Sequence, residues 1–198
     1  MDLNEITRDF QSLRVKRRHY IWEPFMKKYD CNYVCEVGVQ IGENFIDFIQ
    51  HNPKLAVAVD SWINDGTISR NDGGYTQEEL ETQYQAFRER VKDKDFVKIC
   101  REYSFDAAKK FEDNFFDLIY IDADHTFDAC YKDIVDWYPK VKPGKFLTGD
   151  DYRVYKAKRT RVRFGVIEAV NKFATENKLD IILLPKHGWA IVKPEQIN

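Results

Sequence analysis

A short apolar run that ends in a glycine-bearing turn constrains this chain most. Residues 33–37 are predicted to form a buried strand, Gly38 and Gly42 follow, and a helix is expected over residues 43–50. Glycines at a strand-to-helix turn let the backbone approach a ligand, because no Cβ stands in the way. Gln40 occupies the place of a glycine in the G-x-G-x-x-G pattern of dinucleotide binders. The turn therefore predicts a ligand site of another kind, with an ordinary strand-to-helix turn as the alternative.

Strand-like and helix-like segments alternate along the rest of the chain. Expected strands cover residues 33–37, 55–59, 96–100, 115–121, 146–149, 179–184 and 189–192. Expected helices after the glycine turn cover residues 77–92, 104–111, 126–138 and 166–176, and residues 142–145 are expected to form a turn. This alternation predicts an α/β fold. We expect a Rossmann-like, doubly wound, mostly parallel seven-stranded sheet with a C-terminal antiparallel hairpin strand.

A single domain accounts for the whole chain. Its 198 residues can bury a substantial core, and no repeat or linker composition divides them. We assign residues 1–198 to one domain, with an N-terminal helical cap over residues 1–30 and a Rossmann-like core over residues 33–193. The polar, glycine-bearing stretch 63–76 is a candidate lid over a bound substrate, or simply a long connection.

Charge and hydropathy exclude several partners. The net charge of −2 favours no particular class of partner, and no aromatic-basic stacking pattern favours nucleic acid. No apolar stretch reaches the roughly 20 residues that span a bilayer, and the first residues do not resemble a secretion signal. We therefore expect a cytoplasmic protein without a membrane partner. The four cysteines form no C-x-x-C pair and are expected to be reduced and buried.

The segment 153–163 is unusually basic, with six lysines and arginines and no acid. It follows an acidic strand end, so we expect it near the rim of the site. A solvated loop is one interpretation. The other is a docking surface for an anionic substrate, such as a phosphorylated or nucleotide-linked glycan.

Acidic side chains follow the strands at the edge where ligands gather in an open α/β sheet. Asp60 lies 18 residues after Gly42, close to the offset of about 20 residues at which a strand-end acid accepts ribose hydroxyls. Trp62 is placed to stack on an adenine. Asp122, Asp150 and Asp151 end two further strands, and three carboxylates without cysteine partners suit a hard cation such as Mg²⁺. Structural capping aspartates are the alternative for all of these positions.

Five segments in a fixed order give the chain a family resemblance. They are Glu36–Gly42, Val57–Trp62, Asp117–His125, Tyr138–Lys145 and Gly149–Tyr152. Together they resemble class I S-adenosylmethionine-dependent methyltransferases, and most closely the subgroup with metal-dependent O-methyltransferases that act on sugars of antibiotics. The resemblance runs from about residue 33 to 193 and leaves out residues 1–30 and 63–76.

The resemblance implies a binding site for S-adenosylmethionine. Glu36, Gly38 and Gly42 would hold its amino-acid and ribose part, Asp60 the ribose hydroxyls, and Ser104 the adenine. The full set of implied cofactor-binding residues is Glu36, Gly38, Gly42, Asn44, Asp60, Ser61, Trp62, Ser104 and Asp122. The chain departs from many relatives at Tyr103, where those relatives carry an acid just before the serine.

The resemblance also implies a metal site and a catalytic group. Asp122, Asp150 and Asp151 match the positions that bind Mg²⁺ in metal-dependent relatives. His125 stands where phenol-methylating relatives place a basic lysine, and its ordinary pKa suits a base near neutral pH. We expect His125 to be the base, with Asp124 as alternative base or orienter and Asp122 completing the catalytic set.

The expected function is therefore metal-assisted O-methylation of a hydroxyl, with S-adenosylmethionine and Mg²⁺ or another divalent cation as cofactors. The expected acceptor is a small molecule or glycan, with an anionic one as an option and a homodimer as an option for assembly. Two alternatives stay open: O-methylation of a small phenol or catechol, and a non-catalytic module that binds S-adenosylmethionine.

Overall fold

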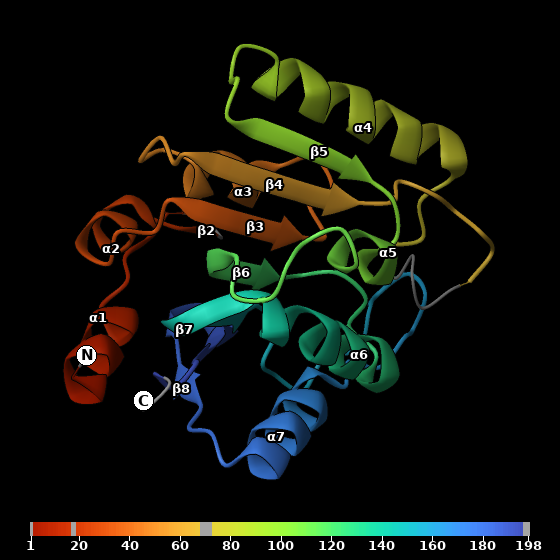
Figure 1. Cartoon of the computed structure of the whole chain (residues 1–198). Coiled ribbons are helices and arrows are strands. Elements are labelled where there is room, and N and C mark those ends of the chain that lie inside the picture. Colours follow the sequence, from red (N-terminus) through yellow and green to blue (C-terminus); the bar gives the residue numbers. More distant parts are fainter. Residues whose placement is uncertain (1, 17–18, 68–72, 196–198) are drawn as a thin grey trace.

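The computed structural model describes residues 2–16, 19–67 and 73–195, and these residues form one twisted sheet covered by helices (Figure 1). The sheet has seven strands in the order β5-β4-β3-β6-β7-β9-β8. The strands are β3 (Tyr33–Val37), β4 (Leu55–Asp60), β5 (Val97–Arg101), β6 (Phe116–Ile121), β7 (Val141–Gly149), β8 (Ile182–Leu183) and β9 (Trp189–Val192). The five strands from β5 to β7 are parallel, and β9 runs antiparallel between β7 and β8. The predicted α/β sheet with its closing hairpin is confirmed.

Helices cover both faces of the sheet, as a doubly wound fold requires. The helices of the core are α3 (Glu43–Phe48), α4 (Gln77–Val91), α5 (Ser104–Ala108), α6 (Phe127–Trp137) and α7 (Val166–Asn177). The chain runs from β3 outward to β4 and β5, then returns to β6 on the other side of β3. This reversal opens a crevice at the carboxyl ends of β3 and β6. Within the described ranges, every helix is too short or too polar to traverse a bilayer.

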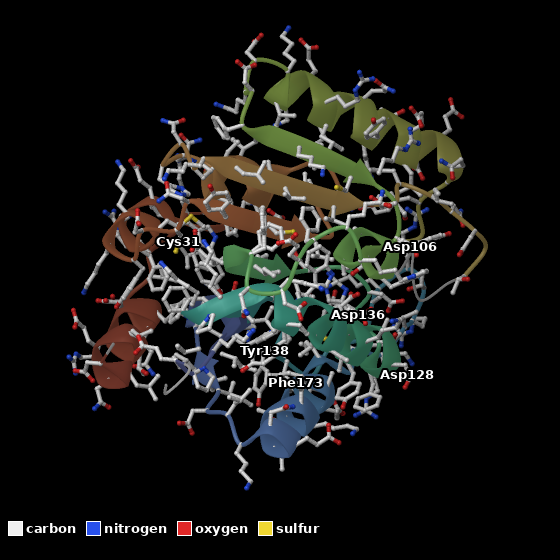
Figure 2. The ribbon with its side chains drawn as sticks, in the orientation of Figure 1. Cys31, Asp106, Asp128, Asp136, Tyr138 and Phe173 are labelled. Carbon is white, nitrogen blue, oxygen red and sulfur yellow. The ribbon has the colours of Figure 1, made fainter. Side chains whose placement is uncertain are left out.

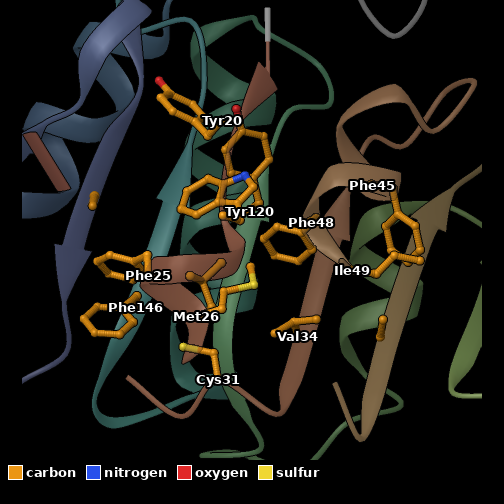
Figure 3. Packing of buried hydrophobic residues seen from close by; sticks show 14 of the residues in the cluster. Tyr20, Phe25, Met26, Cys31, Val34, Phe45, Phe48, Ile49, Tyr120 and Phe146 are labelled. Atoms are coloured by element: carbon orange, nitrogen blue, oxygen red, sulfur yellow. The ribbon is translucent and has the colours of Figure 1, made fainter. Parts of the chain in front are cut away.

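One face of the sheet packs against the N-terminal segment and α3. Aromatic rings dominate this cluster: Trp22 contacts Phe48 and Tyr120 edge to face, at centroid distances of 5.7 Å each. Phe25 contacts Phe146 of β7 in the same way, at a centroid distance of 5.2 Å, and Figure 3 shows these two rings side by side. Such edge-to-face pairs add to the free energy gained by burying the rings. The N-terminal segment is therefore part of the core and lies directly beneath β6 and β7.

The opposite face packs against α5, α6 and α7. Successive residues of β3 alternate between the faces, with Val34 in the first cluster and Cys35 in the second. Figure 2 shows Tyr138, at the end of α6, beside Phe173 of α7, with ring centroids 5.0 Å apart. All four cysteines are buried and unpaired, as the sequence predicts: Cys31, Cys35, Cys100 and Cys130.

The N-terminal cap is less helical than predicted. Within the helical cap predicted over residues 1–30, the structure has α1 (Leu3–Gln11), a two-stranded ribbon of β1 (Val15–Lys16) and β2 (His19–Tyr20), and α2 (Glu23–Lys28). Pro24 lies in the first turn of α2, because proline fits the first turn of a helix but not its interior. Tyr20 donates a hydrogen bond to the carbonyl of Pro185, so the ribbon ties the N-terminal segment to the closing hairpin.

Two connections also differ from the prediction. Strand β7 begins at Val141, five residues before the expected start, and residues 142–145 bulge between the pairs Phe116↔Val141 and Leu118↔Phe146. Gly144 has a φ of +74° there, so the expected turn survives as a bulge within the strand. Of the candidate lid 63–76, residues 68–72 lie outside the described residues.

Candidate functional site

A cleft of about 1290 Å³ opens at the carboxyl ends of β3, β4, β6 and β7. Strand register explains why the predicted residues meet there. Val37 pairs with both Val59 and Ile121, and Ile121 pairs with Gly149, so the residues after all four strands lie at one edge. A second hollow of about 530 Å³ between α4 and β5 contains none of the predicted site residues.

Gly38 is required by the close approach of two strand ends. Its φ is +94°, and a Cβ built on it would lie 2.0 Å from the carbonyl oxygen of Asp122. Gly42 has a φ of +75° and lies under the ring of Phe87, which a Cβ would approach to 2.3 Å. Gly38 lines the cleft, whereas Gly42 is not among the lining residues. The geometry therefore gives Gly42 a packing role, and its contact with a cofactor stays a prediction.

Glu36 and Asn44 place unpartnered polar atoms in the wall of the cleft. Glu36 is 1% exposed and Asn44 is 7% exposed. Glu36 Oε2 and both amide atoms of Asn44 are buried without a hydrogen-bond partner among the described residues. Burial raises the pKa of Glu36 well above its usual value and the charge of Asp122 adds to the rise, whereas the neighbouring Asn44 side chain opposes it. Because buried polar groups normally have partners, these atoms fit a polar ligand.

Asp60 organises the backbone of the glycine turn. Its Oδ2 accepts a hydrogen bond from the N–H of Gln40 at 2.8 Å, and its Oδ1 accepts one from the N–H of Trp62 at 2.9 Å. Burial raises the pKa of Asp60, although these hydrogen bonds and one from Ser61 oppose the rise. Asp60 and Ser61 both line the cleft. The acid that the sequence singles out therefore also has a structural function, as the capping alternative expected.

Trp62 lines the cleft, but its ring is largely covered by protein, so its stacking on an adenine stays a prediction. The side chain is 1% exposed, and its indole packs against Tyr84 and Phe87 of α4 at centroid distances of 4.9 and 5.8 Å. Its Nε1 donates to the carbonyl of Gln40. The ring is occupied by these contacts because the chain turns under α4, with a φ of +47° at Trp62.

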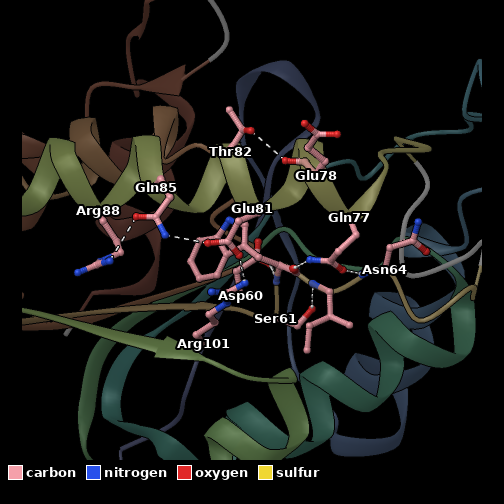
Figure 4. Close-up of polar contacts among 12 residues, drawn as sticks. Asp60, Ser61, Asn64, Gln77, Glu78, Glu81, Thr82, Gln85, Arg88 and Arg101 are labelled. Carbon is pink, nitrogen blue, oxygen red and sulfur yellow. Dashed lines mark hydrogen bonds and ion pairs between the residues drawn. The ribbon is translucent and has the colours of Figure 1, made fainter.

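Helix α4 is tied to the same turn by polar contacts. Gln77 Nε2 donates to the carbonyl of Trp62 at 3.0 Å, and Gln77 Oε1 accepts from the N–H of Asn64 at 2.8 Å (Figure 4). Glu81 pairs with Arg101 at the end of β5. These contacts fix the start of the 63–76 connection on the wall of the cleft.

Ser104 lies in the cleft beside an acid that sequence reasoning missed. Ser104 Oγ donates to Asp133 Oδ1 at 2.5 Å and accepts from Trp137 Nε1 at 2.8 Å. Asp133 is 7% exposed and lines the cleft, and burial raises its pKa to about 7. A signal was present, since Asp133 shares the spacing of Cys130, Ile134 and Trp137, the buried face of α6.

Asp122, His125 and Asp151 converge at the other end of the cleft. His125 Nε2 lies 3.1 Å from Asp122 Oδ1 and 3.2 Å from Asp151 Oδ2. One ligand atom from each residue can be chosen so that all three lie within 4.8 Å of one another. This donor set of two carboxylates and an imidazole fits a divalent cation. The residues that could hold an ion in the structure are therefore Asp122, His125 and Asp151. The sequence predicted Asp150 in place of His125.

The two adjacent acids of the predicted metal site differ in their surroundings. Burial and the charges of Asp122 and Asp151 raise the pKa of Asp150 to about 7. Burial also raises the pKa of Asp151, but the contacts with His125 and Arg153 outweigh it and hold that pKa below its usual value. Asp150 Oδ1 accepts from the N–H of Asp151, and both residues line the cleft.

Asp124 stabilises the turn that precedes α6. Its Oδ1 accepts from the N–H of Thr126 at 2.9 Å and from the hydroxyl of Thr126 at 2.7 Å, directly before α6. Asp124 also lines the cleft, and both of these contacts involve its Oδ1. Its predicted role as alternative base stays a prediction, with a structural role beside it.

The segment after Asp151 folds back over His125. Phe164 stacks on the imidazole at a centroid distance of 4.2 Å and an interplanar angle of 7°. The N–H of Gly165 donates to the carbonyl of His125 at 2.8 Å. Phe164 is far from His125 in the sequence, and no pattern in the sequence pointed to it.

The comparisons with known proteins agree with this geometry. A family model described as "Methyltransferase domain" matches residues 35–152. None of the curated proteins compared with the chain matches its sequence.

Solved structures with a similar fold include enzymes of more than one kind. The O-methyltransferase from Bacillus cereus in complex with SAH has 13% identity and a TM-score of 0.61, covering 96% of this chain and 88% of that one. The O-methyltransferase NovP has 13% identity and a TM-score of 0.59, with coverage of 96% and 80%. Spermidine synthase from Thermotoga maritima has 13% identity and a TM-score of 0.54, with coverage of 86% and 54%. At these identities the likeness concerns the fold.

Proposed function

Because this chain belongs to the methyltransferase-domain family, we propose that it moves the methyl group of S-adenosylmethionine to a hydroxyl of a sugar or glycan, with help from a divalent cation. Support comes from one cleft that holds two chemically distinct ends. At one end, the buried atoms of Glu36 and Asn44 lack partners. At the other end, Asp122, His125 and Asp151 converge.

The first end suits the cofactor. An ammonium or hydroxyl group can supply the donor that Glu36 Oε2 lacks, and the amide of Asn44 can donate as well as accept. Gly38 keeps the floor of the cleft open beside them, since it carries no side chain. Ser104 and Asp133 line the same cleft and offer a hydroxyl and a carboxyl to the remaining part of the cofactor.

The second end suits removal of a proton. A sugar hydroxyl ionises poorly at neutral pH, and a divalent cation supplies charge that makes its proton easier to remove. Asp122 and Asp151 would hold such a cation. His125 Nε2 faces both carboxylates, so it can accept the proton as a base or serve as a third ligand. Its stacking on Phe164 fixes the plane of the ring in either role.

Three measurements test the proposal. S-adenosylhomocysteine should bind in calorimetry, labelled S-adenosylmethionine should transfer its methyl group to an acceptor in a mass-spectrometric screen, and EDTA should abolish the transfer. Transfer that survives complete chelation would remove the cation from the proposal. Binding without transfer to any acceptor would favour a non-catalytic module, and transfer to phenols alone would favour the other class of acceptor.

A substitution separates the two roles of His125. If His125 is the base, His125→Ala should lower kcat by roughly 100-fold or more and remove a limb of the pH–rate profile, because base catalysis contributes about that much. If His125 is a ligand, His125→Ala should instead weaken the affinity for the added cation. His51→Gln is the matched control, because His51 bonds the carbonyl of Cys31 outside the cleft. A near-normal rate for His125→Ala from pH 6 to 9 would exclude the base.

A further inference from the structure

The basic segment 153–163 forms a small hairpin at the second end of the cleft. The N–H of Ala157 donates to the carbonyl of Val162 at 2.8 Å, and the N–H of Phe164 donates to the carbonyl of Tyr155 at 3.0 Å. Lys156 and Arg163 form a β-bridge between the two arms. The segment is therefore an ordered element with a definite inner and outer side.

Side chains at the base of the hairpin anchor it to the candidate site. Phe164 stacks on His125, and Tyr155 meets Phe164 edge to face at a centroid distance of 4.9 Å. Arg153 lies over the ring of Tyr155 at 4.4 Å and pairs with Asp151 at 2.6 Å. The position of the hairpin is thus set by the residues that would carry the chemistry.

The hairpin carries more positive charge than its neighbours neutralise. Arg153 pairs with Asp151, and Arg163 pairs with Glu168. Within the described ranges, four further cations of the hairpin have no carboxylate partner: Lys156, Lys158, Arg159 and Arg161. Of these four, Lys158 lines the cleft. One unneutralised cation therefore faces the site from this side.

A second cation faces the site from another segment. Lys186 lies in the turn 185–187, has a φ of +59°, and lines the same cleft. Hydrogen bonds fix this turn, from Tyr20 to the carbonyl of Pro185 and from the N–H of Tyr152 to the carbonyl of His187. Lys186 has no carboxylate partner in the part of the chain that the structure describes. The two lysines come from segments that the fold holds independently.

Arg153 adds an unused donor at the same end. Its terminal nitrogen is engaged by Asp151, but its Nε is buried without a hydrogen-bond partner among the described residues. Leaving a buried donor unpaired is unfavourable, so a ligand that accepts a hydrogen bond from it is favoured. Lys158, Lys186 and Arg153 together favour an acceptor with negative charge.

We propose that the acceptor carries a phosphate ester, which Lys158, Lys186 and Arg153 Nε bind while its hydroxyl lies beside Asp122 and His125. This inference rests on the proposed function and names its class of acceptor. Lysine binds phosphate as a point charge, and two such charges match a dianion. A nucleic acid fits less well, because the whole chain has a net charge of −2 and the basic surface is one hairpin.

Binding of a simple anion tests the site without turnover. Inorganic phosphate and pyrophosphate are titrated by calorimetry into the protein saturated with S-adenosylhomocysteine. The double variant Lys158→Gln/Lys186→Gln should weaken binding at least tenfold. The matched control Lys156→Gln/Arg161→Gln removes the same charge from positions that do not line the cleft, and it should change binding less than twofold. Equal weakening in both variants, or no binding to the unmodified protein, would overturn the inference.

Turnover separates this inference from the proposed function. A sugar and its phosphate ester are compared as acceptors, and kcat/KM should favour the ester at least tenfold in the unmodified protein. The double variant Lys158→Gln/Lys186→Gln should lose that preference through KM. Transfer that prefers the neutral sugar in all variants would refute the phosphate site and leave methyl transfer intact. Phosphate binding that depends on the two lysines, with no transfer to either acceptor, would refute methyl transfer and leave the anion site.

Discussion

The two ends of the cleft are built in different ways. The end that we propose for the cofactor (the cofactor end) is shaped by a backbone turn beside the side chains of Glu36 and Asn44: the turn after β3 bends at Gly38 and is held by N–H groups that donate to Asp60. The end that we propose for the acceptor (the acceptor end) consists of side chains from four separate segments, represented by His125, Asp151, Phe164 and Lys186. The first end is fixed by the strand order of the sheet. The side chains of the second end can be substituted without altering the strand order. We therefore expect that end to determine which acceptor binds.

The two ends also differ in whether the protein places positive charge beside their acidic side chains. At the cofactor end, burial raises the pKa of Glu36 and of Asp60, and in the part of the chain that is described no lysine or arginine pairs with either acid. At the acceptor end, Asp151 keeps its pKa below the usual value because His125 and Arg153 contact it. At the first end the protein therefore supplies no positive charge to Glu36 or Asp60, whereas at the second end His125 and Arg153 supply it to Asp151.

A substitution that displaces the backbone of the cofactor end should have the largest effect on the affinity for S-adenosylhomocysteine. Gly38→Ala forces a Cβ to within 2.0 Å of the Asp122 carbonyl oxygen, so the two strand ends must separate. We expect loss of S-adenosylhomocysteine binding by more than about 100-fold, since backbone contacts of this kind cannot relax cheaply. Calorimetry measures the affinity, and circular dichroism reports whether the fold is retained.

A second glycine supplies the control for that substitution. Gly66 has a φ of +83° and no atom within 4 Å of an added Cβ. Gly66→Ala therefore introduces a similar conformational strain without a clash, and it should leave the affinity within about twofold. Equal losses of affinity in both variants would mean that backbone strain, and not the contact with the end of β6, explains the effect of Gly38→Ala.

Removing one charge from the acceptor end should stop the chemistry and spare the cofactor. Asp151→Asn keeps the shape and tolerates the φ of +55° at this position, because asparagine adopts left-handed conformations readily. We expect kcat to fall on the order of 100-fold while the affinity for S-adenosylhomocysteine stays within twofold. Asp113→Asn, at an exposed ion pair with Lys140, is the control. A parallel loss of cofactor affinity would show that the two ends are not independent.

Glu36→Gln tests the electrostatic difference between the two ends, and its effect on cofactor affinity should be smaller. In the free protein the raised pKa of Glu36 favours the protonated carboxyl, and a bound cation would favour ionisation. Cofactor affinity should therefore rise with pH as the proton becomes easier to release, and binding should release protons to the buffer. Glu36→Gln should bind about tenfold more weakly at pH 8 and lose the pH dependence. An unchanged pH dependence in the variant would assign it to another group.

The sequence was sufficient where structure follows from local pattern. The alternation of strand-like and helix-like segments predicted the mostly parallel sheet, and Asp122 and Asp150 meet because Ile121 pairs with Gly149 in adjacent parallel strands. It was insufficient where side chains meet through tertiary packing. The packing of Trp62 against α4 is one case, because it depends on the turn of the chain at that residue and no local pattern signals it. Phe164 reaches His125 across a long connection that carries no periodic signal.

Asp133 should show the smallest effect on catalysis and a clear one on stability. Its pKa of about 7 in the folded protein exceeds the usual 3.8, so its contribution to stability is complete at low pH and is lost as pH rises toward 7. Asparagine copies the uncharged form and still accepts from Ser104. The free energy of unfolding of Asp133→Asn, relative to the unmodified protein, should therefore rise by about 2–3 kcal/mol from pH 5 to pH 8. Urea denaturation at the two pH values measures this difference, and kcat should change only a few-fold. If the difference in the free energy of unfolding is the same at pH 5 and pH 8, the carboxyl of Asp133 is already ionised at pH 5. The pKa values of Asp133 and Asp151 would then differ less than we propose.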